Sequence, residues 1–136
     1  MTAPVPTSLS LEPENADALR HLRGLSAHSD IVEPLFKTVR GLPGADCYSP
    51  DYSRYAYVVA YVGDRIFAFA EGMHGLTLRI PSDAAHAAAA VGAKASPIGG
   101  DWWLFSLFGE SGAIEGIDAW IARAYAHALS MQRGAE

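Results

Sequence analysis

Three short stretches in the middle of the chain alternate in a way that predicts strands. They run from Tyr55 to Val62, from Arg65 to Ala70 and from Gly75 to Ile80. Between the first two, Gly63-Asp64 is a two-residue hairpin signal. The second corner, Gly72 to Gly75, is closed by two glycines that can adopt positive φ. The pattern therefore predicts consecutive antiparallel strands.

The third stretch alternates most cleanly, with Leu76, Leu78 and Ile80 on one face and Thr77 and Arg79 on the other. This division is typical of a sheet with one face partly exposed to water. A fourth strand is expected from Trp102 to Phe108, which is apolar on both faces apart from Ser106. Such a strand must be covered on both sides, by helices or by a second subunit.

Helical spacing of apolar residues appears at both ends of the chain. It predicts two helices before the sheet, a short alanine-rich helix over 84–91 that Ser82 would cap, and a long C-terminal helix over 114–131. The segments 45–53 and 94–100 are expected to be irregular. We therefore predict an α+β fold with an antiparallel sheet of four or more strands. Residues 1–9 are expected to form a flexible segment, 10–131 a single domain and 132–136 a tail.

Composition narrows the classes of function. The chain has 136 residues, half of them apolar, and 15 acidic residues against 10 Lys and Arg. The acidic balance argues against broad phosphate binding, which needs clustered positive charge. No apolar run approaches the roughly 20 residues of a membrane helix, and the first residues lack the features of a signal peptide. We therefore expect a cytoplasmic protein without a membrane partner.

The chain shows no pattern of residues typical of catalysis or metal binding. Its five histidines are scattered, without the spacing of a metal site. Cys47 is the sole cysteine, and the charge of Asp46 beside it is expected to raise the thiol pKa. The serine in Gly109 to Gly112 does not have the spacing of a nucleophile elbow. We predict a protein that is not an enzyme, with no cofactor and no metal.

Aromatic residues supply the leading candidates for a binding surface. Trp102 and Trp103 are adjacent in a predicted strand, so their side chains point to opposite faces. Tyr57 lies among several tyrosines, which are common at recognition surfaces and dimer contacts. Met73 and His74 occupy the corner of the second hairpin. Core packing is the competing explanation for the aromatic residues, and turn formation by the flanking glycines is the competing explanation for Met73 and His74.

These features favour a non-enzymatic binding or regulatory module, acting as a homodimer through its aromatic strand. A small-molecule pocket between the helices and the sheet is an alternative.

The order of elements resembles that of MmcQ/YjbR-type proteins and of the related TfoX N-terminal domain. The resemblance lies in Gly63 to Ala68, Leu76 to Pro81, Gly99 to Trp103 and Ala124 to His127, with Arg40 to Gly44 before the sheet. It covers roughly Ile31 to Leu129. It implies an α+β domain with an antiparallel sheet, of a type often described as DNA-binding.

Weak DNA binding is therefore a second alternative. Its candidate residues are Lys37, Arg40, Arg54 and Arg65, which could gather if the second helix crosses the strand ends. Acidic residues interleave with them along the chain. A mixed, solvated surface is the competing explanation, and nucleic acid is not the leading partner.

Overall fold

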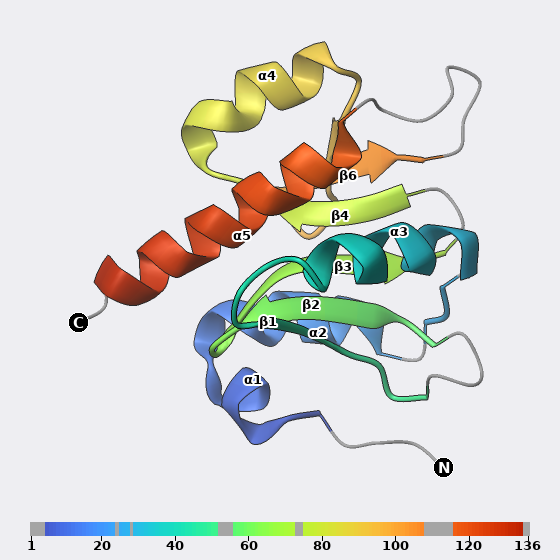
Figure 1. The fold of residues 1–136 in the computed structure, drawn as a ribbon, viewed down its shortest axis with the longest axis vertical. Helices are drawn as coiled ribbons and strands as arrows, with labels where there is room; N and C mark the ends of the chain where they lie inside the picture. The colour runs from blue at the N-terminus through green and yellow to red at the C-terminus, as the bar shows by residue number, and fades with distance from the viewer. Residues whose placement is uncertain are drawn as a thin grey trace.

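A computed structural model describes residues 5–23, 25–27, 29–51, 56–72, 75–107 and 116–134. Its centre is one antiparallel sheet in the order β1-β2-β3-β4-β6-β5 (Figure 1). The strands are β1 (Ala45–Tyr48), β2 (Val58–Val62), β3 (Arg65–Glu71), β4 (Gly75–Arg79), β5 (Lys94–Ala95) and β6 (Trp102–Ser106). The predicted α+β class with an antiparallel sheet is confirmed.

The helices differ in number and order from the prediction. Three of them and a 3-10 turn precede the sheet: α1 (Thr7–Leu11), η1 (Pro13–Asn15), α2 (Ala16–Leu22) and α3 (Ser29–Val39). The alanine-rich segment forms η2 (Ser82–Ala84) and α4 (Ala85–Ala90), and the chain closes with α5 (Ile117–Gly134). Ser82 does not cap this segment, since Pro81 occupies the N-cap position and no side chain bonds there.

The sheet is covered on both faces, each with its own apolar core. On one face α3, α4 and α5 pack over a large core that includes Phe67, Phe105 and Trp120. On the other face α1 and α2 pack over a smaller core that includes Phe69 and Trp102. Figure 1 shows α3 and α5 in front of the sheet and α2 behind it, with α1 below the edge of the sheet in this view. The expectation of a partly wet face is therefore wrong, and Thr77 is buried.

Small side chains and a β-bulge in β3 let the helices of the larger core pack closely against the sheet. Ala60, Ala68 and Ala70 are fully buried on that side, which lets helices approach the strands closely. Ala60 pairs with Ala68 and Tyr61 pairs with Ile66, so Phe67 is the extra residue of a β-bulge. Its ring packs edge-on against Tyr125 of α5, with ring centroids 5.9 Å apart. The bulge thus places a large ring against the C-terminal helix.

Several predicted boundaries are corrected by the structure. Residues 1–9 are predicted to be flexible, but Thr7–Leu11 is helical and Leu9 is fully buried in the smaller core. The irregular segment 45–53 contains β1, which forms because it can pair with β2. The predicted loop 94–100 contains β5, two residues paired with β6. The first predicted strand begins at Val58, and Tyr55 lies outside the described residues.

The edge strand β1 has its outward N–H groups occupied. The N–H of Ala45 donates to the carbonyl of Leu42 at 3.1 Å. The N–H of Cys47, two residues on and therefore on the same side of the strand, donates to Asp46 Oδ1 at 2.8 Å. Both donors are satisfied by residues of the same short segment.

Candidate functional site

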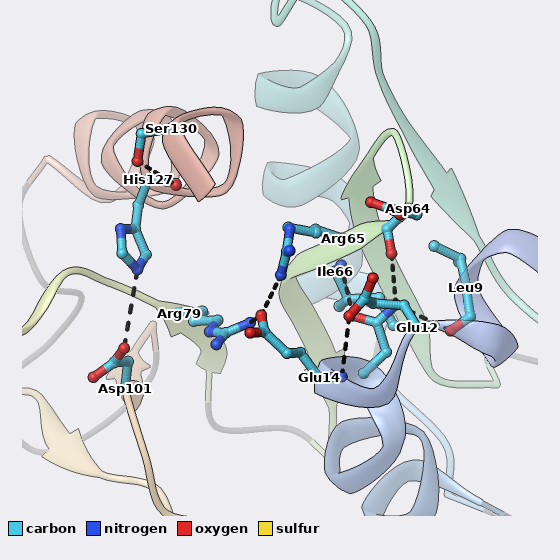
Figure 2. A network of polar contacts seen from close by, with 11 residues as sticks. Leu9, Glu12, Glu14, Asp64, Arg65, Ile66, Arg79, Asp101, His127 and Ser130 are labelled. Atoms are coloured by element: carbon cyan, nitrogen blue, oxygen red, sulfur yellow. Dashed lines mark hydrogen bonds and ion pairs between the residues drawn. The ribbon is translucent and has the colours of Figure 1, made fainter. Parts of the chain in front are cut away.

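Charged side chains from five separate segments meet at one end of the sheet (Figure 2). We call this group the sheet-end cluster and define it as Glu14, Arg65, Arg79, Asp101 and His127. Glu14 lies in η1, Arg65 begins β3, Arg79 ends β4, Asp101 directly precedes β6, and His127 lies in α5.

Strand register explains why the residues of the sheet reach the same place. The hairpin at Gly63-Asp64 pairs Val62 with Arg65, as the sequence predicts, and so puts Arg65 at the start of β3. Arg79 pairs with Trp102, and the N–H of Ile80 donates to the carbonyl of Asp101 at 3.0 Å. The start of β3, the end of β4 and the start of β6 therefore lie at one end of the sheet.

The N-terminal segment is attached to this end of the sheet by Asn15, which is fully buried. Its Oδ1 accepts from the N–H of Ile66 at 3.1 Å, and its Nδ2 donates to the carbonyl of Asp64 at 2.7 Å and to that of Leu9 at 3.0 Å. Because Arg65 pairs with β2, the N–H of Ile66 and the carbonyl of Asp64, on either side of Arg65, point the other way, toward β4. The first residue of β3 that pairs with β4 is Ala68, whose partner is Leu78. Ile66 comes before this point, so Asn15 takes the place of the missing strand partner.

Asn15 in turn fixes the position of Glu14. One carboxylate oxygen of Glu14, Oε2, accepts a hydrogen bond from each arginine. Nη1 of Arg79 donates to it at 3.1 Å, and Nη1 of Arg65 also donates to it. The side chains of Arg65 and Arg79 are 11% and 15% exposed, whereas that of Glu14 is 40% exposed. Two shielded guanidinium groups thus hold one accessible carboxylate.

His127 borders the same charges from the helix side. Its Nε2 lies 3.9 Å from Asp101 Oδ2, which is too long for a hydrogen bond. Burial lowers the pKa of His127, and the charge of Arg79 lowers it further, against the opposing effects of Asp101, Asp83 and Glu14. His127 Nε2 and Arg65 Nε are both buried and have no hydrogen-bond partner within the described residues.

The chemistry that these groups support is the binding of a charged or hydrogen-bonding group. Guanidinium donors recognise carboxylate and phosphate oxygens, and buried donors without a partner favour a ligand that accepts hydrogen bonds. The hydroxyl of Ser130, three residues after His127, donates to the backbone carbonyl of His127 at 2.8 Å. Among the described residues, no three His, Cys, Asp or Glu side chains are grouped to hold a metal ion.

The aromatic candidates are mostly core residues. Trp102 is 6% exposed and packs against Phe69 with ring centroids 5.2 Å apart. Tyr57 is equally buried in the same core, and Trp103 is half-buried against the larger one. As predicted, the two tryptophans lie on opposite faces of the sheet. Met73 and His74 lie outside the described residues.

The aromatic strand β6 is also not an edge of the sheet, because β5 pairs with it at Trp103 and Leu104. The predicted dimer contact would therefore have to involve side chains rather than free strand edges.

The candidates for nucleic-acid binding have different surroundings where the structure describes them. Lys37 and Arg40 are exposed on α3 and just after it. Arg65 is buried and bonded to Glu14 at the sheet end. Arg54 lies outside the described residues. Of the four, only Arg65 belongs to the sheet-end cluster.

Sequence reasoning did not select four members of the cluster: Glu14, Arg79, Asp101 and His127. An acidic residue near a helix start, such as Glu14, has a sufficient local explanation in the helix dipole, and Arg79 was predicted to lie on a partly exposed face. Their contacts join residues 51 and 65 positions apart along the chain. No short motif encodes such contacts.

No family model matches this chain, and neither the curated proteins nor the solved structures contain a match to it. Within the described residues, none of the helices has the length and apolar character needed to cross a membrane.

Proposed function

We propose that this chain is a non-enzymatic binding or regulatory module whose ligand occupies the sheet-end cluster. The observation that carries the proposal is the convergence of Arg65 and Arg79 on one partly exposed carboxylate, beside two buried nitrogens without a protein partner among the described residues. Buried polar groups normally have a hydrogen-bond partner, so an exception calls for an explanation, and a bound ligand is one that fits a donor of this kind. The resemblance to MmcQ/YjbR-type proteins and the cytoplasmic location remain part of the same proposal.

The cluster has the composition of a recognition site. Two guanidinium groups in a poorly solvated position hold an anion more strongly than they would in water. The imidazole of His127 is kept neutral by its surroundings and can donate or accept one hydrogen bond. This combination can distinguish a ligand by its charge and by its hydrogen-bonding groups.

The test is a melting-temperature screen of the purified chain against a panel of small anionic, cationic and neutral metabolites. A ligand that binds only the folded state raises the melting temperature, and the rise grows with the logarithm of its concentration once that exceeds Kd. Arg79→Gln is expected to abolish the rise. Arg20→Gln is the matched control, because Arg20 is exposed and pairs with Asp17 on α2. A ligand shift that Arg79→Gln leaves unchanged would place binding elsewhere and contradict the proposal.

The homodimer is a separate part of the proposal with its own support. Trp103 is half-buried, and Val91, just after α4, is 45% exposed although it is apolar. Apolar surface of this kind is common at contacts between subunits. Sedimentation velocity at rising concentration is expected to show a dimer that Trp103→Ala weakens without loss of folding. A monomer throughout the concentration range would refute the dimer.

A further inference from the structure

We infer that Arg65 and Arg79 form a site for a small monocarboxylate ligand, and that Glu14 is its built-in competitor. The inference rests on the proposed binding role of the sheet-end cluster. It adds the class of ligand, and it states that Glu14 occupies the site when no ligand is bound. The Glu14 carboxylate then stands where the carboxylate of the ligand would bind.

The two arginines already show which chemical group they accept. Both donate through Nη1 to the same oxygen, Oε2 of Glu14. They come from neighbouring antiparallel strands, and their side chains are largely shielded from water. Arg65 Nε is buried without a partner among the described residues, so this guanidinium has a donor that Glu14 does not use. A free carboxylate is not held by the Glu14 backbone and can align with such donors better.

Glu14 can leave this position while the segment that carries it stays in place. Its neighbour Asn15 makes three hydrogen bonds to backbone groups, and Leu9 is fully buried. The Glu14 side chain, in contrast, is 40% exposed, so rotation about its own torsions can move the carboxylate into water. Exchange with a ligand thus requires a side-chain movement and no undocking of α1 or α2.

Charge balance favours a single negative charge over a phosphate. The cluster holds two cations, Arg65 and Arg79, and two acids, Glu14 and Asp101, so it is neutral when His127 is uncharged. Asp83 acts on His127 as a further acid. A monocarboxylate that replaces the Glu14 carboxylate preserves this balance. A phosphate dianion would add a further negative charge beside Asp101 and Asp83, which costs free energy at a poorly solvated site.

The experiment uses propionate, which has the structure of the glutamate side chain, with the full chain carrying Glu14→Ala. Propionate is expected to raise the melting temperature of Glu14→Ala with the logarithmic concentration dependence of a single site, and with a Kd at least about tenfold below that for the wild type, because the tethered competitor is gone. Propionamide, its neutral counterpart, and inorganic phosphate are expected to give a smaller rise. Asp17→Ala, which removes a carboxylate from α2 next in the chain, is expected to behave as the wild type.

Any one of three results in these variants would overturn the inference. The first is an equal response of Glu14→Ala and Asp17→Ala to propionate, and the second is an equal response of Glu14→Ala to propionamide or phosphate. The third is a propionate response that survives Arg79→Gln in the Glu14→Ala background. A metabolite that binds the wild type through Arg79 while propionate fails would refute this inference alone. Propionate binding by Glu14→Ala without any ligand for the wild type would refute the proposed function alone.

Discussion

Asn15 bonds to the backbone of Ile66 as a neighbouring strand would, with its Oδ1 3.1 Å from the amide nitrogen. The same side chain donates to the carbonyl of Asp64. One carboxamide therefore satisfies the two backbone groups at the start of β3, the N–H of Ile66 and the carbonyl of Asp64, that point toward β4 but lie before the first pair of β3 and β4 residues. The backbone of β3 needs these partners because unpaired buried peptide groups are costly. A single side chain therefore completes the sheet and orients the segment that carries Glu14.

We expect Asn15→Ala to lower the free energy of unfolding by about 2–4 kcal/mol, because it leaves buried backbone groups without partners. Asn15→Asp is expected to be at least as damaging, since it keeps an acceptor for Ile66 but turns an oxygen toward the carbonyls of Leu9 and Asp64. Urea unfolding followed by circular dichroism measures both. Ser10→Ala, which removes an exposed hydroxyl bonded to Thr7, is the control. Losses as small as that of the control would contradict this role.

Gly75 is required by the distance between β4 and β6. A Cβ at this position would lie 2.0 Å from the carbonyl oxygen of Phe105, so the paired strands would have to separate. We expect Gly75→Ala to destabilise the fold by about 3 kcal/mol or more. Gly41→Ala is the matched control: its Cβ would lie 3.6 Å from the nearest atom, an ordinary contact, and the change should be neutral or slightly stabilising. Thermal unfolding of both variants decides the matter.

His127 makes stability depend on pH. Burial, and then the charge of Arg79, lowers its pKa in the folded state, so the unfolded chain binds a proton more readily. Its contribution to stability is complete above the pKa of an unperturbed histidine, and is lost as the pH falls from there through the lowered value. We therefore expect the wild type to lose more stability than His127→Gln between about pH 7.5 and about pH 5.5.

The control variant for this comparison is His86→Gln, which removes an exposed histidine of α4. Urea unfolding at a series of pH values measures the three proteins. An identical pH dependence for the wild type and His127→Gln would show that another group causes the loss.

Cys47 is expected to react slowly with thiol reagents. Burial, and then the charge of Asp46, raises its pKa to about 12, against the opposing effect of Arg40. A thiol of this pKa is almost fully protonated at about pH 8, and the thiolate is the reactive form. We expect alkylation by iodoacetamide to be slow in the folded chain and fast in urea. Asp46→Asn should leave it slow, because burial is the larger cause; fast labelling of the folded wild type would contradict this account.

The sequence was sufficient for the elements whose signals are local. Gly63-Asp64 marks the hairpin that the structure shows, and the apolar character of the strand beginning at Trp102 required cover on both faces, which it has. The predicted effect of Asp46 on the Cys47 thiol has the right direction, but burial is the larger cause. Burial depends on the packed fold, which the local pattern does not contain.

The sheet-end cluster could not be predicted because its signals are not local. Glu14 is equally well explained as an acid that suits a helix start, and Arg79 as a residue on a wet face. Only the docking of η1 beside β3 brings Glu14 to both arginines. The same reason applies to α1 and β1: each is short, and each is defined by the partner it packs or pairs with in the folded chain.

The occupied donors of β1 have a consequence for association between molecules. A strand from another chain that approached this edge would find the N–H groups of Ala45 and Cys47 already bonded to Leu42 and Asp46. Continuous sheets that run from molecule to molecule, the geometry of fibrils, are therefore opposed at this side of the protein. Removal of the Asp46 carboxylate would open a hydrogen-bonding position there and leave the core untouched.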